Sequence, residues 1–224
     1  MTEAPEVAQV VMPERGLFLV RCVCPPPPRG AQAVVSLDYG LDLGRVVSAG
    51  RYDPARHGDR LPGFQLVRAK TDADDAALAE NAARADAMRA VFLKAAEEAS
   101  PGLRVPDARL SFGRRRLFVR LVSPAPQPDL SRAVDALRRQ FGVSVSVWHL
   151  GARDEVAVLG GMGPCGWPCC CATWMTRYPE NLAAARPRGG CPAGMTGTCG
   201  RFKCCLAFER PAQGESKDEG GEDE

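Results

Sequence analysis

The chain carries one cysteine-rich sequence twice, first as Gly163-Pro164-Cys165-Gly166-Trp167-Pro168-Cys169-Cys170-Cys171 and then as Gly197-Thr198-Cys199-Gly200-Arg201-Phe202-Lys203-Cys204-Cys205. Each copy contains a Cys-Gly pair, three variable residues and a Cys-Cys pair. Eight of the ten cysteines in the 224-residue chain lie in this region, so a repeat rather than chance sets their positions. The six repeated cysteines are Cys165, Cys170, Cys171, Cys199, Cys204 and Cys205.

The length and the N-terminus indicate a cytoplasmic protein. A chain of 224 residues buries enough apolar surface to fold without disulfides. Residues 1–9 lack the basic and apolar regions of a signal peptide, and there is no apolar run of the roughly 18 residues that a membrane span needs. In a reducing compartment, a dense group of cysteines favours metal binding or redox chemistry over a disulfide framework.

The charge is divided between a basic body and an acidic tail. Residues 215–224 carry a net charge of −5, which leaves +7 for residues 1–214. Only four of the 29 basic residues are lysines, and the planar guanidinium of arginine pairs well with phosphates and carboxylates. This composition is compatible with nucleic-acid binding, but an arginine-rich proteome would produce it as well. We expect the acidic tail to be disordered, because it has few apolar side chains to bury.

Ligands made of cysteine alone indicate zinc or an iron–sulfur cluster. A thiol oxidoreductase usually has one Cys-x-x-Cys motif at the start of a helix, whereas the cysteine pairs here are adjacent or separated by four residues. A cysteine hydrolase needs a positioned histidine, and the chain has only His57 and His149. We interpret His57 as a loop residue and His149 as a structural or surface residue.

The spacing of the cysteines bears on the choice of metal. Structural zinc ribbons favour Cys-x2-Cys knuckles, whereas the Cys-x4-Cys-Cys spacing found here needs a wider loop. A glycine after each first cysteine allows backbone amides to approach the sulfur closely. Adjacent cysteines seldom both reach one ion without strain. A cluster is larger than an ion, so adjacent cysteines bind it more easily.

Counting the ligands leaves three arrangements open. Two sites of four ligands need eight thiolates, and the repeat supplies six. Either the chain makes one complete site, or Cys169 and Cys191 complete two sites, or a partner protein donates the missing ligands. Cys22 and Cys24 lie outside the region, on an apolar strand, and we interpret them as small buried hydrophobic residues.

Short strands are expected in the N-terminal third of the chain, at residues 7–12, 16–24, 33–37 and 43–47, where β-branched and apolar residues alternate. The proline run at residues 25–28 cannot continue a strand and indicates a loop. Gly40 and Gly44 indicate a hairpin or a bulge that lets the sheet bend. Together these features predict a small curled sheet or barrel.

The pattern changes to helical at Thr71, whose acidic neighbours favour the first turn of a long amphipathic helix running to about Ser100. Two strands, over residues 104–112 and 116–122, then form a hairpin. A second helix over residues 130–141 ends at Gly142, and one more strand follows over residues 143–148. We expect the helices to cover one face of a mainly antiparallel sheet. The charged residues 153–155 are expected in a solvated turn or in an ionic contact with the cysteine loops.

The sequence therefore predicts an α+β protein with four parts. They are a small N-terminal β-sheet or barrel (1–63), an α/β sandwich with an antiparallel sheet and a long helix (64–158), a cysteine-rich metal-binding segment (159–210) and a disordered acidic tail (211–224).

These motifs resemble the YaaT (RicT) family of bacterial cytoplasmic proteins, also described as the PSP C-terminal domain family and as stage-zero sporulation proteins. The resemblance covers residues 10–209, and its most specific parts are residues 160–168 and Cys199-Gly200-Arg201-Phe202-Lys203-Cys204-Cys205-Leu206-Ala207-Phe208-Glu209. Weaker matches lie at residues 39–47, at 68–71 with Asp74, and at 151–155. The chain departs from the family pattern at Trp167, where arginine is usual, and at Cys169, where leucine is usual.

The resemblance implies a non-catalytic subunit that associates with two small helical partners of the YlbF and YmcA type in a complex bearing 4Fe–4S clusters. In that family the complex acts in messenger RNA maturation through the endoribonuclease RNase Y, and in spore formers it acts in development. By position, the cluster-region cysteines of the family match Cys165, Cys170, Cys171, Cys199, Cys204 and Cys205. We therefore expect an iron–sulfur-bearing adaptor of an RNA-processing assembly.

Two other functions remain open at this point. One is a zinc-stabilised nucleic-acid-binding module that uses the basic body for phosphates and Phe202 or Trp174 for stacking on bases. The other is a redox switch whose neighbouring thiols oxidise reversibly.

Overall fold

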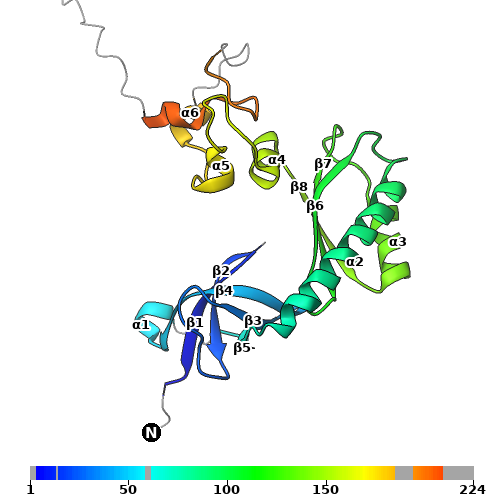
Figure 1. The fold of residues 1–224 in the computed structure, drawn as a ribbon. Helices are drawn as coiled ribbons and strands as arrows, with labels where there is room; N and C mark the ends of the chain where they lie inside the picture. The colour runs from blue at the N-terminus through cyan, green and yellow to red at the C-terminus, as the bar shows by residue number, and fades with distance from the viewer. Residues whose placement is uncertain (1–3, 14, 59–61, 185–193, 209–224) are drawn as a thin grey trace, which may run out of the picture. The chain divides into compact units, whose positions relative to one another are not determined.

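The computed structural model describes residues 4–13, 15–58, 62–184 and 194–208. The chain divides into two compact units, Met1–His149 and Leu150–Glu224, each of which is described by itself (Figure 1). The acidic tail that the sequence predicts to be disordered lies outside the described residues. None of the helices in the described ranges is long and apolar enough to cross a membrane.

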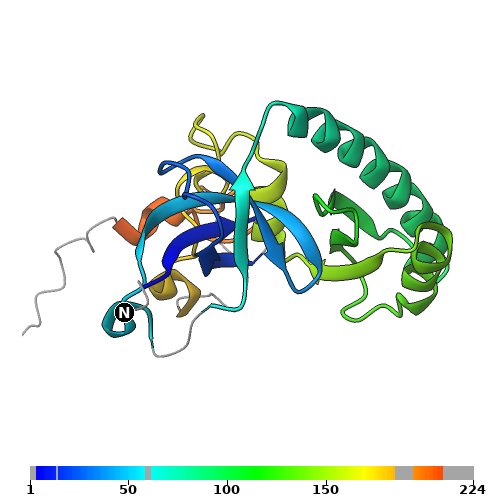
Figure 2. The same ribbon diagram turned by 90° about the horizontal axis from the view of Figure 1, so that it is seen from below.

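The first unit begins with a closed barrel of five strands in the order β1-β2-β5-β3-β4 (Figure 2). Alternating apolar residues, such as Val10, Val20 and Val35, point into its interior and are fully buried. The predicted N-terminal barrel is thus confirmed. Its strands are β1 (Glu6–Met12), β2 (Gly16–Cys22), β3 (Gln32–Leu37), β4 (Gly40–Arg51) and β5 (Gln65–Ala69).

Two glycines shape the barrel where the sequence predicts a bend. Gly40 has a φ of 107° and closes the tight hairpin between β3 and β4, a conformation that favours glycine. Gly44 has no room for a side chain, because an added Cβ would lie 2.5 Å from Met12 Sδ and 3.2 Å from Val11 O. The pairing of β1 with β4 also shifts register after Gln9, so β1 crosses the glycine closely.

His57 lies in a short helix, α1 (Pro54–His57), and the interpretation of this residue as part of a loop is wrong. Asp53 begins the helix by accepting a hydrogen bond from the N–H of Ala55 at 3.0 Å. The N–H of Asp53 in turn donates to Nδ1 of His57 at 3.0 Å. These contacts give His57 a local structural role.

Cys22 lies in β2, and Cys24 follows it after the strand has ended. Both side chains are half-buried and pack against the barrel core. Burial raises the pKa of Cys22 to about 11, and the charge of Glu6 adds to the increase. These observations agree with the interpretation of the two cysteines as small hydrophobic residues.

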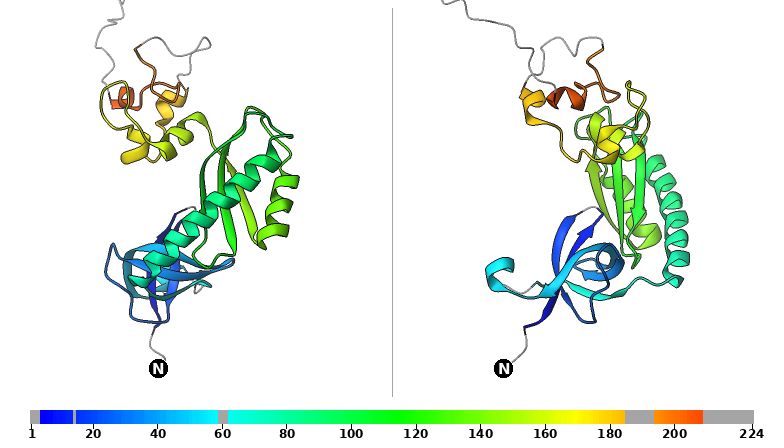
Figure 3. Two further views of the ribbon diagram at one scale, coloured as in Figure 1. Left: turned by 45° about the vertical axis from the view of Figure 1, so that its right-hand side comes forward. Right: turned by 60° about the vertical axis from the view of Figure 1, so that its left-hand side comes forward.

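The rest of the first unit is a three-stranded sheet with two helices on one face (Figure 3). Phe92, Leu117 and Leu137 lie in the fully buried core between the helices and the sheet. As predicted, the second helix ends at Gly142, which adopts the left-handed conformation. The elements are α2 (Ala73–Ala96), β6 (Arg104–Leu110), β7 (Arg116–Val122), α3 (Ser131–Phe141) and β8 (Ser144–His149).

The sheet is mixed rather than mainly antiparallel. β6 and β7 form the predicted antiparallel hairpin, but β8 pairs in parallel with β7 from Arg116↔Ser144 to Leu121↔His149. The reason is that α3 separates β7 from β8 in sequence, and a helical crossover returns the chain so that the next strand runs in the same direction.

A buried carboxylate joins the barrel to this layer within the first unit. Asp42 is completely buried and accepts two hydrogen bonds from Arg109 of β6, at 2.9 and 2.8 Å. Its other donors are the hydroxyl of Tyr39 and the backbone N–H groups of Leu43 and Phe112. Burial opposes ionisation of Asp42, but the hydrogen bonds and charge of Arg109 outweigh it, so the pKa of Asp42 is lowered.

Candidate metal centre

The first cysteine repeat opens with a tight turn in the second unit. Met162 and Pro168 form an isolated antiparallel bridge at its base. Inside the bridge, the N–H of Gly163 donates to the carbonyl of Trp167 at 2.8 Å. Gly166, which follows the first cysteine, has a φ of 78° and donates back to the carbonyl of Gly163 at 3.0 Å. The glycine is needed because other residues rarely adopt this φ.

The second repeat forms the same turn. Thr196 and Phe202 make the corresponding bridge, and the N–H of Gly197 donates to the carbonyl of Arg201 at 2.8 Å. Gly200 has a φ of 73° and donates to the carbonyl of Gly197 at 2.9 Å. The duplicated sequence is therefore a duplicated structure, hydrogen bond for hydrogen bond.

Each turn leads directly into a short helix that begins at a Cys-Cys pair. In the first repeat this is α5 (Cys170–Thr173), and in the second it is the 3-10 helix η1 (Cys204–Phe208). The residue before the pair is Cys169 in the first repeat and Lys203 in the second. This difference explains why Cys169 stands outside the six repeated cysteines although it occupies a position within the repeated structure.

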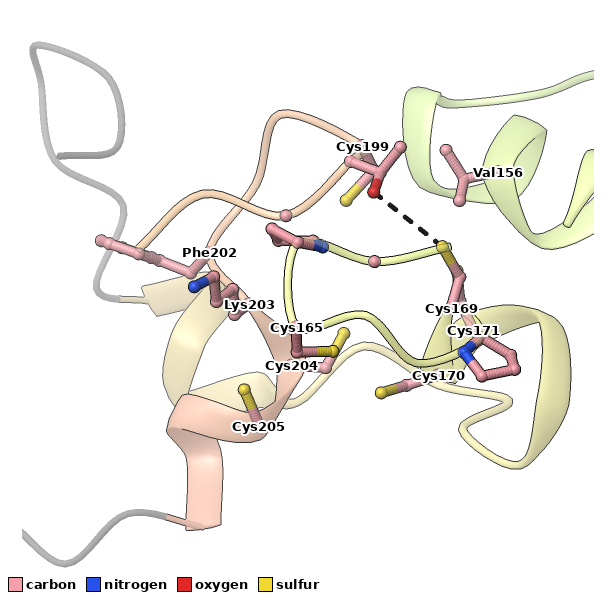
Figure 4. Close-up of a pocket in the computed structure, with 15 residues that line it drawn as sticks. Val156, Cys165, Cys169, Cys170, Cys171, Cys199, Phe202, Lys203, Cys204 and Cys205 are labelled. Carbon is pink, nitrogen blue, oxygen red and sulfur yellow. Dashed lines mark hydrogen bonds between the residues drawn. The ribbon is translucent and has the colours of Figure 1, made fainter. Parts of the chain in front are cut away.

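Both repeats line one cavity of about 70 Å³ (Figure 4). One water molecule needs roughly 10–15 Å³, so the cavity has room for more than a single small ion. All six repeated cysteines lie on its wall together with Cys169. None of the nine cysteines among the described residues forms a disulfide.

Four of these cysteines form a first set, which we call the four-thiol group: Cys165, Cys170, Cys204 and Cys205. Burial raises the pKa of Cys170, and its neighbours Cys204, Cys165 and Cys205 raise it further because nearby thiolates repel one another. In Figure 4 the sulfur atoms of Cys165, Cys170 and Cys204 point toward one another. Each repeat contributes two cysteines to this group.

The other three cysteines form a second set, which we call the three-thiol group: Cys169, Cys171 and Cys199. Burial raises the pKa of Cys171, the charge of Arg153 opposes the increase, and Cys169 and Cys199 add to it. Cys169 is buried, and its Sγ lies 3.9 Å from Oγ1 of Thr198, the residue before Cys199. The structure therefore brings Cys169 to the site together with the repeated cysteines.

The thiols are not gathered around one point. Within the described ranges, no three Cys, His, Asp or Glu side chains come close enough together to hold one metal ion. Four sulfurs around zinc, at Zn–S distances of about 2.3 Å, lie about 3.8 Å apart. The metal-binding character expected from the sequence is thus not confirmed, and it is taken up below as a proposal. Cys191 lies outside the described residues.

Arg153 is a residue for which the sequence left two alternatives open, a solvated turn and an ionic contact with the cysteine loops. It lies in α4 (Ala152–Leu159) rather than in a solvated turn, and it is only 6% exposed. One guanidinium nitrogen donates to the carbonyl of Met175 at 2.6 Å, while the buried Nε has no hydrogen-bond partner among the described residues. The sequence did contain a signal: Asp154 accepts a hydrogen bond from the N–H of Gly151, a pairing typical of a helix start.

Large apolar side chains are exposed around the cysteine turns. Trp167 is 74% exposed and Trp174 is 63% exposed. They line a second cavity of about 360 Å³ together with Cys165 and Cys170 of the four-thiol group. Other exposed apolar residues of this unit are Leu159, Met162, Met195 and Phe208.

Comparison with known proteins gives one line of support for the family. No family model matches the chain, and no solved structure matches it. The stage 0 sporulation protein YaaT of Bacillus subtilis (strain 168) is 26% identical over 154 residues, which make up 68% of this chain and 55% of YaaT. The chain thus spans about half the length of this curated relative. The match bears out the resemblance that the cysteine repeats and their flanking motifs predicted, and the chain is accordingly similar to YaaT over about two thirds of its length.

Proposed function

We propose that the cysteine-rich unit holds a 4Fe–4S cluster and that the chain is a non-catalytic adaptor, or regulatory subunit, of a bacterial RNA-processing assembly. The observation that carries the proposal is the cavity on whose wall seven thiols from two copies of one turn meet. A donor set made only of thiolates fits iron–sulfur clusters and structural zinc.

The four-thiol group is the proposed ligand set, and its spread favours a cluster over zinc. Its cysteines surround a cavity larger than one ion, and within the described residues no three of them converge on a point. A cluster accepts ligands that are farther apart, because each thiolate binds a different iron atom. Because each repeat supplies two of the four ligands, a bound cluster would cross-link the two turns.

The three-thiol group is one thiolate short of a second site. Cys191 and a cysteine of a partner protein are the two sources of a fourth ligand. A Cys191→Ser variant separates them, because it lowers the iron content of the isolated chain only if Cys191 is a ligand.

Arg153 supports an anionic group beside the three-thiol group. Its guanidinium is buried, and in the part of the chain that the structure describes Nε has no hydrogen-bond partner, an arrangement that costs stability unless an acceptor is supplied. Because its charge already opposes the rise in the pKa of Cys171, it stabilises a thiolate there. A cluster supplies one-electron chemistry when bound.

The exposed apolar side chains support an adaptor role. Trp167 and Trp174 flank a cavity beside the four-thiol group, and isolated soluble domains rarely expose several large apolar residues together. We propose that small helical partners of the YlbF and YmcA type dock there and that the assembly acts with RNase Y. The name of the Bacillus subtilis relative refers to sporulation, so we propose a regulatory role in that process where the host forms spores.

The test is the cofactor content of cysteine variants purified without oxygen. We expect Cys165→Ser and Cys204→Ser to lose iron, sulfide and partner binding together. The control is Cys22→Ser, a cysteine of the barrel, which is expected to lose none of them. Loss of iron from Cys22→Ser, or full iron in Cys165→Ser, would show that the ligands are placed wrongly.

A further inference from the structure

The three-stranded sheet has a second face, which the helices do not cover. Along β7 and β8, Leu117, Val119, Val145 and Val147 point to the helices and pack in their core. The alternate residues point the other way. Among them we define the second sheet face by Arg116, Arg120, Ser144, Ser146 and Trp148.

Trp148 is an accessible aromatic ring in a fixed position. It is 36% exposed, and its ring stacks on Phe118 with centroids 5.5 Å apart and an interplanar angle of 22°. Phe118 is buried and is itself held edge-on by Tyr39 of the barrel at 5.4 Å. Because buried neighbours already fix the indole, little conformational entropy is lost when another flat ring stacks on it.

The hairpin beside this ring carries an excess of positive charge. The hairpin of β6 and β7, residues 104–122, contains six arginines and one acidic residue, Asp107. Arg120 lies directly opposite Trp148 in the strand pairing. Asp107 lies 3.7 Å from Arg120. Two further carboxylates come from outside the hairpin, since Asp42 pairs with Arg109 and Glu80 pairs with Arg114. These three carboxylates do not offset six positive charges. The chemistry of the face thus matches a polyanion that also carries flat rings.

Arg116 extends the charged surface along β7. It lies opposite Ser144, and its Nε donates to Oγ of Ser144 at 3.2 Å. The guanidinium also lies over the ring of Tyr39, 4.8 Å from its centroid, which restrains it further. Ser146, between Ser144 and Trp148 on the same face, adds a hydroxyl group.

We propose that the second sheet face binds single-stranded nucleic acid. A base stacks on Trp148, while phosphates pair with Arg116 and Arg120. Stacking on an aromatic side chain is tolerant of sequence, because every base has a flat face, so we expect little base preference. The face lies in the first unit and uses none of the cysteines, so it is independent of the proposed metal site.

Binding is measured with the full chain and short fluorescein-labelled oligouridylate or oligothymidylate at low salt. We expect at least one of the two to bind, with an affinity that falls steeply as salt rises. If only one binds, it identifies the nucleic acid. No binding of either, tighter binding of duplex DNA, or equal competition by a polyglutamate peptide would overturn the proposal.

Variants locate the binding on this face. Trp148→Ala is expected to weaken binding about 5- to 150-fold, the range for loss of one stacked base, and the matched control Trp174→Ala to leave it unchanged. Arg120→Gln is expected to weaken binding and to reduce the slope of log K against log salt by about 0.7, the value for one phosphate contact on a single strand. Its control is Arg132→Gln, an exposed arginine on α3. Equal losses in the variants and their controls would contradict the assignment.

A spectroscopic measurement covers the case in which Trp148→Ala folds poorly. The chain has three tryptophans, so Trp148 becomes the sole indole in a Trp167→Phe, Trp174→Phe background. We expect the oligonucleotide to quench the fluorescence of Trp148 in parallel with binding. Binding without quenching would place the nucleic acid elsewhere and refute the role of Trp148.

Discussion

Replacing Asp42 by asparagine tests the junction between the barrel and the helical layer of the first unit. The substitution keeps the shape of the side chain but removes the charge that faces Arg109. The NH2 group of the asparagine also faces groups that are themselves hydrogen-bond donors, so it cannot replace the oxygen that accepted from them. Breaking a buried ion pair from one side costs about 3–5 kcal/mol. Since the side chain of Arg109 is 28% exposed and keeps some access to water, we take the lower end, about 3 kcal/mol. For a unit of roughly this size, that corresponds to a decrease in Tm of about 6–12 °C.

The assay is urea unfolding of the full chain followed by far-ultraviolet circular dichroism, because the strands and the long helices lie in the first unit. The matched control is Asp38→Asn, which removes an ion pair with Arg15. The side chain of Asp38 is 50% exposed, unlike that of the buried Asp42. Pairs of that kind contribute about 0–1 kcal/mol. A loss below about 1 kcal/mol for Asp42→Asn, or a loss equal to that of the control, would refute this explanation of the junction.

The pH dependence gives the same prediction an independent check. The folded-state pKa of Asp42 lies below its unfolded value, which is about 3.9. The carboxylate therefore contributes its full stabilisation above that pH, and the contribution is lost as the pH falls through the folded pKa. We expect the stability difference between the wild-type chain and Asp42→Asn to be constant from neutral pH down to about 5 and to shrink below about 4. A difference that grows on acidification would contradict the reasoning.

Two further predictions concern the barrel. Gly44→Ala is expected to destabilise the chain by about 1–3 kcal/mol, because the added methyl group overlaps Met12. The control Gly50→Ala in the same strand meets nothing within 4 Å and is expected to change stability little, so equal urea midpoints for the two variants would rule out the overlap. Cys22 is expected to remain a thiol at pH 8, since burial raises its pKa to about 11. Iodoacetamide should therefore label Cys22 far more slowly than the exposed Cys165 in metal-free, reduced protein; equal labelling rates in peptide mass spectrometry would contradict this.

Local patterns predicted most elements of the first unit. Alternating residues located four of the five barrel strands, and Gly142 located the end of α3, because these signals act within a few residues of the chain. The fifth strand, β5, was not predicted and lies beyond residue 63, where the sequence analysis ended the barrel. The direction of β8 was predicted wrongly, since a strand's own sequence does not show which neighbour it pairs with. The helix between β7 and β8 was the available clue, because a helical crossover favours a parallel partner.

The sequence of the cysteine-rich unit predicted that its two repeats belong together, but not how the thiols divide. The grouping of Cys170 with Cys204 and of Cys171 with Cys199 depends on how the two turns face each other, and no spacing within one repeat contains that information. The burial of Arg153 was not predicted for a related reason. A charged residue near a glycine is usually solvated, and its burial depends on the carbonyl of Met175, which is distant in sequence.

The measurement that tests the central claim most directly is the metal and sulfide content of the full chain purified without oxygen, read together with its visible absorption spectrum. A cluster held by the two cysteine turns predicts a brown protein with iron and acid-labile sulfide in equal amounts and broad charge-transfer absorption. A colourless protein that contains stoichiometric zinc and no sulfide would contradict it.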